Sequence, residues 1–295
     1  MTMSNEAPFA DLHTHTTCSD GAMTPEQLVD KAAQRGLHVL AITDHDTMDA
    51  YQRLSLGGYN GPVQLIPGVE LSCFEHGRDV HVLGYGLDAS NPLLREFFDG
   101  YRIERFERAE QMVQKIRSLG FQIAMSEVED QAQGAPIGRP HIAAVMVSRG
   151  FAASIQNAFD RWLEAGAPGY VAKNERTVSS TVQLIRQAGG IAVIAHPGRS
   201  FTEPRRFLGL VSSGIDGIEV YHPSHWPTTR EFYRVIAKQH ALVMTGGSDY
   251  HGTRHYDETN FGRIGASRDM VEALLARIEL RRAAQKEHVT SSENS

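Results

Sequence analysis

Histidines and carboxylates recur where the apolar runs of this sequence end. The stretch FADLHTHTTCSDG places two histidines two residues apart, directly after an apolar run. Side chains two residues apart in an extended segment point the same way, so His13 and His15 can bind the same ion. Similar residues stand at or near the ends of later apolar runs: Asp20, Asp44, His45, Glu70, His81, His196, His222, Asp249 and His251.

The elements that carry these residues can bring them together. Short apolar runs alternate with helical patterns such as TPEQLVDKAAQRG, in which Thr24 is the expected N-cap and Gly36 the expected end. Repeated strand–helix units predict a parallel sheet with crossover helices, and their number is compatible with closure into a barrel. The carboxyl ends of parallel strands meet at one face of a barrel, where these residues would converge on a metal site.

The metal-site prediction depends on the joint pattern, because a single histidine after a strand is more often an ordinary polar residue. Other histidines stand elsewhere and are interpreted as structural or solvated: His38, His76, His240 and His288. His225 and His255 stay open. Cys18 lies inside the first motif, and we interpret it as a packing residue in preference to a thiolate ligand.

The composition is that of an ordinary globular protein. The formal net charge of -6 disfavours a duplex-DNA partner. The sequence contains no apolar run of the ~18 residues that a membrane span needs, and its first ten residues lack the features of a signal peptide. The only two cysteines, Cys18 and Cys73, fit a reducing compartment. We therefore expect a cytoplasmic protein without membrane or duplex-DNA partners.

The strand pattern is interrupted in the middle of the chain. Residues 90–177 are mostly polar and helical in pattern, which predicts a mainly helical insertion over the active site. The barrel would then comprise residues 8–89 and 178–285. Residues 286–295 are polar and are expected to form a flexible tail.

Several stretches resemble the polymerase-and-histidinol-phosphatase (PHP) family of the amidohydrolase superfamily. They follow the family's order from residue 11 to residue 252: DLHTHTTCSDG, AITDHD, GVELSC, DVHVLGYGL, VIAHPG, GIEVYHPSH and GGSDYHG. The resemblance implies an α/β fold, specifically a distorted (β/α)7 barrel, with two to three divalent metal ions at its carboxyl end. Manganese is the metal that the resemblance favours, although imidazole and carboxylate ligands also suit iron or zinc.

The resemblance also implies roles for individual residues. Glu70 would bridge two metals, and Asp11 and Asp44 would orient the ligand histidines. The implied metal ligands are His13, His15, Asp20, His45, Glu70, His81, His196, Asp249 and His251. Three divalent ions and three carboxylates leave a charge of about +3, which suits a phosphate substrate.

The predicted insertion resembles a narrower, stand-alone subgroup of the family. The similar stretches are GAPIGRPHIAAVMVSRG and FDRWLEAGAPGYVAKNE. Members of this subgroup remove the 3′-phosphate from nucleoside 3′,5′-bisphosphates and can degrade short RNA from its 5′ end. The resemblance therefore implies a metal-dependent phosphatase whose partners are a nucleotide and short single-stranded RNA.

Substrate contacts are expected from basic residues of this segment, because a planar guanidinium suits phosphate. In IGRPH, Arg139 and His141 flank a proline, and we expect this stretch to form a loop. His222 would contact the phosphate or donate a proton to the leaving oxygen. For the arginines of YRIERFERAEQ, a solvated helix face stays an alternative, since glutamates alternate with them. The expected substrate residues are Arg102, Arg105, Arg139, His141, Lys173 and Asn174.

Other functions remain open at this point. A histidinol-phosphate-type phosphatase or a general phosphoesterase would use the same ligands, whereas an amide hydrolase fits the resemblance less well. The alternative that is not an enzyme is a metal-binding module that stabilises a polymerase. The complete ligand set argues against that alternative.

Overall fold

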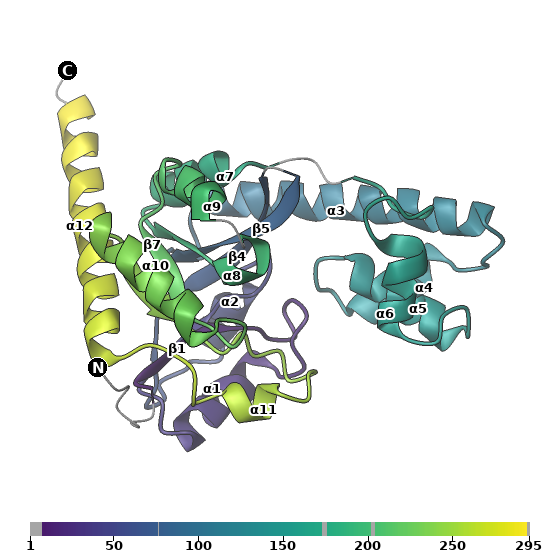
Figure 1. The fold of residues 1–295 in the computed structure, drawn as a ribbon, viewed down its shortest axis with the longest axis horizontal. Coiled ribbons are helices and arrows are strands. Elements are labelled where there is room, and N and C mark those ends of the chain that lie inside the picture. Colours follow the sequence, from purple (N-terminus) through teal and green to yellow (C-terminus); the bar gives the residue numbers. More distant parts are fainter. Residues whose placement is uncertain (1–7, 76, 173–175, 202–203, 294–295) are drawn as a thin grey trace. The chain divides into compact units, whose positions relative to one another are not determined.

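The computed structural model describes residues 8–75, 77–172, 176–201 and 204–293 (Figure 1). Contacts between residues divide the chain into two compact units. The first unit comprises Met1–Leu94 and Glu175–Ser295, and the second comprises Arg95–Asn174. The first unit is a mixed α/β structure with two sheets, and the second is helical. No helix among the described residues has an apolar stretch long enough to cross a membrane.

The first sheet holds three parallel strands in chain order: β1 (Ala10–Thr14), β2 (Val39–Ile42) and β3 (Gln64–Leu65). Helix α1 (Pro25–Gln34) follows β1, and α2 (Asp49–Leu56) follows β2. The expected start of α1 is confirmed, because the Thr24 side chain accepts a hydrogen bond from the Gln27 N–H and forms a capping box. The order strand–helix–strand is the one that the alternating pattern predicts.

The second sheet holds five strands, and it is mixed. The strands are β4 (Gly68–Glu75), β5 (Arg78–Tyr85), β6 (Ile191–Ile194), β7 (Gly217–Tyr221) and β8 (Val243–Gly246). β5 runs antiparallel to both β4 and β6, while β6, β7 and β8 are parallel. The predicted parallel sheet is therefore confirmed for β6, β7 and β8 and wrong for β5. The link between β4 and β5 is too short for a crossover, so these strands must form an antiparallel hairpin.

Neither sheet closes on itself, and single bridges link their edges. Thr14 after β1 bridges in parallel to Tyr250 after β8, and His45 after β2 bridges in parallel to Glu70 of β4. The remaining helices of this unit are α7 (Val178–Gln187), α8 (Pro197–Ser200), α9 (Pro204–Val211), α10 (Pro227–Gln239), α11 (Asp257–Asn260) and α12 (Arg268–Glu293).

The core of the first unit joins strands of both sheets with the last helix. Leu12 of β1 and Leu83 of β5 are buried in the same apolar cluster as Val271, Leu274 and Ile278 of α12. Burial of these side chains holds the strand ends that carry the histidines. Helix α12 continues to Glu293 and so includes most of residues 286–295, which were expected to form a flexible tail.

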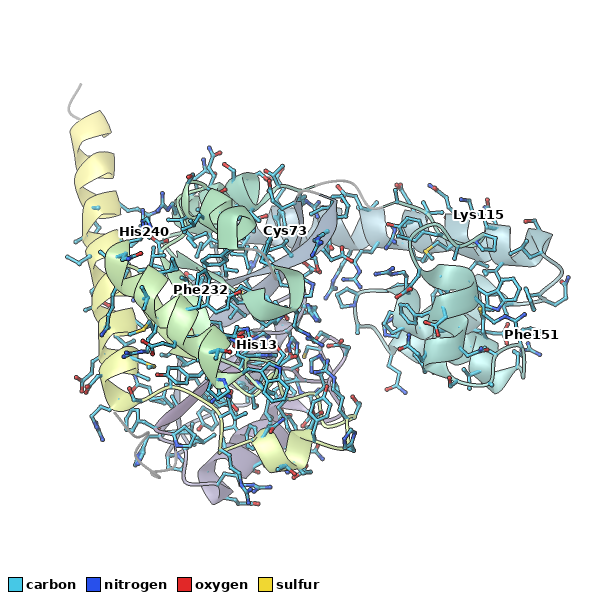
Figure 2. The ribbon with its side chains drawn as sticks, in the orientation of Figure 1. His13, Cys73, Lys115, Phe151, Phe232 and His240 are labelled. Carbon is cyan, nitrogen blue, oxygen red and sulfur yellow. The ribbon has the colours of Figure 1, made fainter. Side chains whose placement is uncertain are left out.

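The second unit has a core of its own. It contains α3 (Pro92–Ser118), α4 (Met125–Ala132), α5 (Arg139–Ser148), α6 (Ile155–Ala158) and the π-helical turn η1 (Phe159–Leu163). Ile116, Val128, Ile142 and Leu163 are buried in one apolar cluster, and Phe151 packs against it (Figure 2). IGRPH was expected to be a loop, but Arg139 begins helix α5. Gly138 is its extended N-cap, and a proline is favourable in the first turn.

Candidate metal centre

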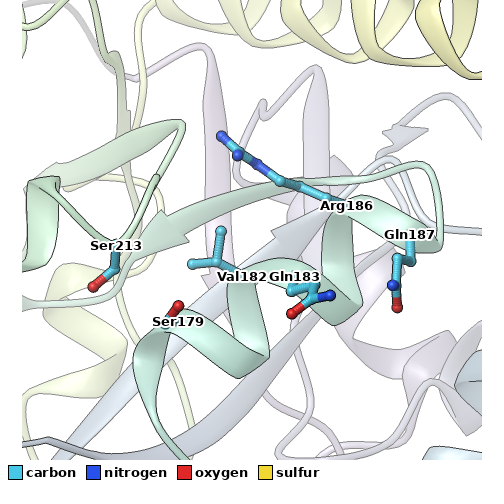
Figure 3. A pocket seen from close by; sticks show the side chains of 6 residues that line it. All are labelled: Ser179, Val182, Gln183, Arg186, Gln187 and Ser213. Carbon is cyan, nitrogen blue, oxygen red and sulfur yellow. The ribbon is translucent and has the colours of Figure 1, made fainter.

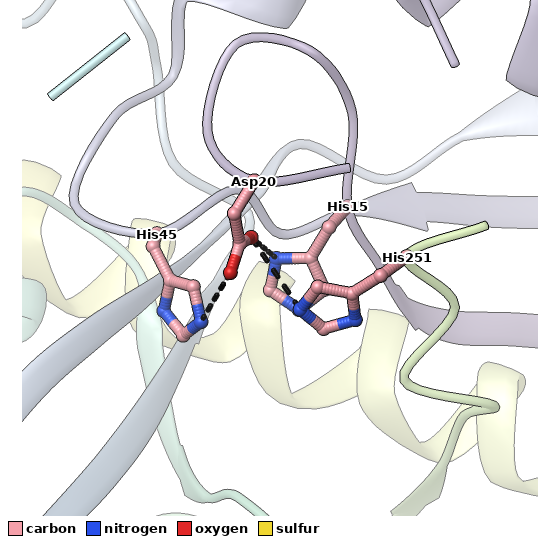
Figure 4. Close-up of side chains that lie close together, drawn as sticks. All are labelled: His15, Asp20, His45 and His251. Atoms are coloured by element: carbon pink, nitrogen blue, oxygen red, sulfur yellow. Dashed lines mark ion pairs between the residues drawn. The ribbon is translucent and has the colours of Figure 1, made fainter. Parts of the chain in front are cut away.

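The nine implied ligands lie in one cluster of the first unit. These residues form four overlapping groups. Within each group, the candidate ligand nitrogen and oxygen atoms lie within 4.8 Å of one another. The groups are His15–Asp20–His45–His251, His13–Glu70–His196, His13–His15–Asp249 and His45–Glu70–His81. Figure 4 shows the first group, in which the Asp20 carboxylate lies between the imidazoles of His45 and His251.

Glu70 lies at the centre of the cluster. Its Oε2 is 3.2 Å from His13 Nε2, 3.3 Å from His15 Nε2 and 3.2 Å from His45 Nδ1. Its Oε1 is 2.8 Å from His81 Nδ1 and 2.9 Å from His196 Nε2. The two oxygens therefore face different sets of histidines, an arrangement that suits a carboxylate shared by two ions.

The pattern predicted Glu70 at the end of a strand, and this prediction is wrong. His81 was expected on a strand, and this prediction is confirmed. Glu70 is the third residue of β4, and His81 lies within the antiparallel β5, opposite Ser72. Pro67 cannot donate a backbone hydrogen bond and separates β3 from β4. The bridge from His45 to Glu70 continues the parallel register past this break, so Glu70 still reaches the edge where β2 ends.

The cluster contains buried polar atoms that lack hydrogen-bond partners. His13 Nε2, both ring nitrogens of His15, His45 Nδ1 and Glu70 Oε2 are all of this kind. Leaving such atoms unsatisfied costs ~1–3 kcal/mol each, and native proteins contain few of them. Nitrogen and oxygen atoms held this close together fit divalent cations, which would satisfy them. Cys18 belongs to none of the ligand groups found among the described residues, and it packs beside an apolar cluster.

Proximity of histidines and carboxylates shifts the pKa values in the protein without metal. Burial raises the pKa of Glu70, Asp249 and Asp20, but the neighbouring histidines outweigh it and hold all three well below the usual range. Burial likewise opposes protonation of His15, but Asp249 and Glu70 raise its pKa to about 10. Burial lowers the pKa of His45 to about 3. Without metal, the carboxylates of the cluster therefore stay ionised. The ring of His15 holds an extra proton, whereas the ring of His45 is neutral.

Glu219 on β7 is a site residue that the sequence interpretation missed. Its side chain is fully buried. Glu219 Oε1 lies 2.9 Å from His13 Nδ1, and Oε2 accepts a hydrogen bond of 2.6 Å from the backbone N–H of His196. A carboxylate that accepts from Nδ1 leaves Nε2 of the ring free to bind a metal. The available signal was an acidic residue inside the apolar strand GIEVY, since a buried charge requires partners.

Asp11 and Asp44 support the backbone that carries the ligands. Asp11 accepts hydrogen bonds from the backbone N–H of His13 at 3.2 Å and of Ser248 at 2.9 Å, and thereby ties β1 to the segment after β8. Asp44 accepts from Thr16 N and Oγ1 at 2.7 and 2.6 Å and from Ser19 Oγ at 2.5 Å. Asp44 thus fixes the turn before Asp20. Both residues thereby hold the main chain next to the candidate ligands.

His222 lies beside the cluster. Its Nε2 is 3.4 Å from Asp249 Oδ2, and its Nδ1 accepts a hydrogen bond of 3.0 Å from the Ser224 backbone N–H. An accepting Nδ1 places the proton of the neutral ring on Nε2, which faces Asp249. Burial lowers the pKa of His222 to about 4, so the neutral ring predominates. A neutral ring with its proton on Nε2 can donate a hydrogen bond to an oxygen at this place.

Three other histidines have structural surroundings, whereas His76 and the side chain of His288 lie outside the described residues. His225, which the sequence left open, lies 2.9 Å from the Val220 carbonyl through Nδ1, and its Nε2 accepts a hydrogen bond from Gly198 N. His240 caps the end of α10, apart from His13 in Figure 2. His38 stacks on Phe9 with ring centroids 4.8 Å apart. These contacts tie loops and strands together.

The substrate residues expected in the insertion lie in the second unit. Arg105 donates from Nε to the Ile137 carbonyl at 2.6 Å, and Arg139 lies over the rings of Phe159 and Tyr170 at 5.5 and 5.9 Å. Arg108 lies near these two arginines. Burial of its side chain and the positive charge of Arg139 both lower its pKa. This unit therefore gathers basic and aromatic side chains.

The remaining residues of that set differ in their surroundings. Arg102 lies on α3, and His141 Nδ1 accepts a hydrogen bond of 3.1 Å from Gly138 N, which caps the start of α5. Lys173 and Asn174 lie outside the described residues.

A separate pocket lies beside α7 (Figure 3). It contains none of the cluster residues, and its Arg186 pairs with the buried Asp216 at 3.2 Å. The lining residues are Ser179, Val182, Gln183, Arg186, Gln187 and Ser213. This pocket is distinct from the metal cluster.

Known proteins resemble this chain over most of its length. The chain is 34% identical over 259 residues to the 5′-3′ exoribonuclease Rnm of Escherichia coli (strain K12), covering 85% of this chain and 88% of that protein. It is also 34% identical over 250 residues to a 3′,5′-nucleoside bisphosphate phosphatase of Chromobacterium violaceum, covering 82% and 86%.

Solved structures and a family model agree with these relatives. A structure described as a metal-dependent phosphoesterase from Bifidobacterium adolescentis superimposes with a TM-score of 0.79 at 32% identity, covering 93% of this chain and 98% of that chain. The family model named PHP domain matches residues 11–167. The resemblance stated from the motifs is thereby confirmed: the chain belongs to the PHP-domain family.

Proposed function

We propose that this protein hydrolyses the 3′-phosphate of nucleoside 3′,5′-bisphosphates, giving the 5′-monophosphate and inorganic phosphate. Short RNA, trimmed from its 5′ end, is the second proposed substrate. The observation that carries the proposal is the cluster around Glu70, in which imidazole and carboxylate atoms face one another without enough hydrogen-bond partners. The bisphosphate phosphatase and the exoribonuclease among the relatives supply the substrate class.

The cluster would hold two to three divalent ions, and manganese is our proposed metal. When bound, the ions would supply Lewis-acid stabilisation of phosphate oxygens and lower the pKa of water. The proposed ligands are His13, His15, Asp20, His45, Glu70, His81, His196, Asp249 and His251, which together form the four groups described above.

The side chains around these ligands position them and bind the substrate. Glu219 keeps the proton of His13 on Nδ1, so that Nε2 faces the cluster. His222 presents an N–H to a phosphate oxygen next to Asp249. Arg102, Arg105, Arg139 and His141, together with Lys173 and Asn174, are our proposed contacts for the phosphate that does not react.

The finer fold assignment is also a proposal. A distorted (β/α)7 barrel over residues 8–89 and 178–285 is supported by the bridges Thr14–Tyr250 and His45–Glu70, which link the edges of the two sheets. Residues 90–177 would form the insertion, and the compact unit Arg95–Asn174 supports this division. A cytoplasmic location stays a prediction from the cysteine content.

A phosphate-release panel tests the proposed function. The metal-loaded protein is assayed with a nucleoside 3′,5′-bisphosphate, a nucleoside 5′-monophosphate, histidinol phosphate and a short 5′-phosphorylated RNA. We expect the highest kcat/KM for the bisphosphate, measurable trimming of RNA and little release from the monophosphate. A preference for histidinol phosphate would favour the histidinol-phosphatase alternative. Equal rates on all monoesters would indicate a general phosphoesterase, and no turnover would favour the metal-binding module.

A further inference from the structure

Two arginines converge on the outer oxygen of Asp249. Arg254 Nη1 lies 3.0 Å and Arg199 Nη1 lies 3.2 Å from Asp249 Oδ2. The other oxygen, Oδ1, faces into the cluster, 3.5 Å from His13 Nε2 and 3.3 Å from His15 Nε2. The Asp249 carboxylate thus lies between the candidate ligands His13 and His15 and a pair of guanidinium groups.

The loops after two parallel strands bring the arginines together. Arg199 lies on α8, three residues after the cluster residue His196 at the end of β6. Arg254 lies three residues after His251, in the segment that follows β8. Both loops emerge where parallel strands end, and both arginines belong to the first unit. Their position beside the cluster therefore follows from the same topology that assembles the histidines.

The charges at this place are not balanced. Two guanidinium groups, which stay protonated in proteins, share one carboxylate oxygen. Two acidic residues follow Arg254 closely in sequence, and both have other partners. Asp257 accepts the backbone N–H groups of His251 and Arg254 at 3.2 and 3.1 Å. Glu258 pairs with Lys31 at 2.8 Å. A divalent ion on Asp249 would compete for its single negative charge. Two adjacent cations then favour an incoming anion.

The arginines are also open to such an anion. The Asp249 side chain is 5% exposed, whereas the side chains of Arg199 and Arg254 are 45% and 29% exposed. Each guanidinium has five N–H donors. Within the described residues, Arg199 donates from Nη1 to Asp249, and Arg254 contacts Asp249 through Nη1 and His251 through Nη2 at 3.4 Å. The remaining donors can bind two oxygens of one phosphate group.

We propose that Arg199 and Arg254 form a phosphate-binding subsite beside the metal cluster. The ligand is a phosphate monoester or the phosphodiester of a short RNA, with its oxygens held by the two guanidinium groups. Arg199 and Arg254 are substrate-positioning residues in this account. The identity of the phosphate rests on the proposed function, but binding of the anion can be measured by itself.

The test uses inorganic phosphate as the probe. Arg199→Gln and Arg254→Gln remove the charge while keeping a hydrogen-bonding side chain. Arg234→Gln is the matched control, because Arg234 also pairs with a carboxylate, Glu231 at 2.9 Å, on the exposed face of α10. Calorimetry measures phosphate binding to the metal-loaded proteins, and elemental analysis measures their metal content.

We expect each site variant to bind phosphate about 10- to 100-fold more weakly than the wild type, with unchanged metal content. Arg234→Gln should bind phosphate like the wild type. Arg199→Lys and Arg254→Lys keep the charge and should retain part of the affinity, and they replace the glutamine variants if those fail to fold. Unchanged phosphate affinity in the variants would overturn the proposal. Altered metal content with unchanged phosphate affinity would show that the arginines only neutralise Asp249.

The same measurements separate this proposal from the proposed function. Wild-type protein that binds phosphate through the arginines but releases none from a nucleoside bisphosphate would contradict the proposed substrate alone. Wild-type protein that hydrolyses the bisphosphate, with arginine variants that bind phosphate normally, would contradict the subsite alone.

Discussion

Replacing Glu219 with glutamine should weaken metal binding through the protonation state of His13. In the wild type, Glu219 Oε1 accepts from His13 Nδ1 at 2.9 Å and Oε2 accepts from His196 N at 2.6 Å. Both partners are donors, and the carboxylate supplies two acceptors. Glutamine supplies one acceptor and one donor group. One of the two contacts must therefore change in Glu219→Gln.

The substitution destabilises the metal-bound state relative to the metal-free state. If the glutamine oxygen accepts from His196 N, its NH₂ faces His13 Nδ1, and the proton of the neutral ring moves to Nε2. His13 then cannot bind a metal through Nε2. If the side chain flips, NH₂ faces the His196 N–H, and a buried donor loses its partner. The second arrangement costs about 1–3 kcal/mol, which corresponds to a loss of about 5- to 150-fold in metal affinity.

Calorimetric titration of the metal-free protein measures this effect. Asp216→Asn is the matched control. Asp216 is also a buried carboxylate, and it accepts a hydrogen bond of 3.0 Å from the Ala192 backbone N–H. It differs from Glu219 because it precedes β7, at the end of the strand opposite to the cluster. Asp216→Asn should lower the melting temperature and leave metal affinity unchanged. If Glu219→Gln binds metal as tightly as the wild type, Glu219 does not set the protonation state of His13.

Three other predictions follow from the site. Asp249→Ala should abolish turnover, because Asp249 belongs to a candidate ligand group, and should leave the far-ultraviolet circular dichroism unchanged; residual activity above a few per cent would contradict its ligand role. Arg139→Ala should raise KM for a nucleoside bisphosphate more than it lowers kcat, because it removes binding shared by substrate and transition state; an unchanged KM would remove Arg139 from the substrate residues. The raised pKa of His15, about 10, means that metal binding near pH 8 must displace protons, so metal affinity should increase from pH 6 to pH 9. Titration in buffers of different ionisation enthalpy measures the released protons, and absence of release would contradict this prediction.

The ligand cluster could be predicted from the sequence because its residues combine a chemical type with a place. His13, His196 and Asp249 each follow or end an apolar run, and parallel strands bring such positions together. The resemblance also named Glu70 and His81, which lie in the same cluster, although the strand pattern wrongly placed Glu70 at the end of a strand. The hairpin of β4 and β5 reverses one strand, and periodicity alone does not show strand direction.

Residues that act through a partner were harder to predict. Glu219 lies within a strand, where its residue type shows a buried charge but not the ring that it contacts. Arg199 and Arg254 matter because the loops after β6 and β8 converge on Asp249, which depends on tertiary structure. The start of α5 at Arg139 was missed because GRP reads equally as a turn, whereas here the proline occupies the first helical turn.

The identity of the product tests the central proposal most directly. A nucleoside 3′,5′-bisphosphate is incubated with the metal-loaded protein, and phosphorus NMR follows the two phosphate signals. Our account predicts loss of the 3′ signal, with accumulation of the 5′-monophosphate and inorganic phosphate. Accumulation of the 3′-monophosphate, or loss of both phosphates at similar rates, would contradict it.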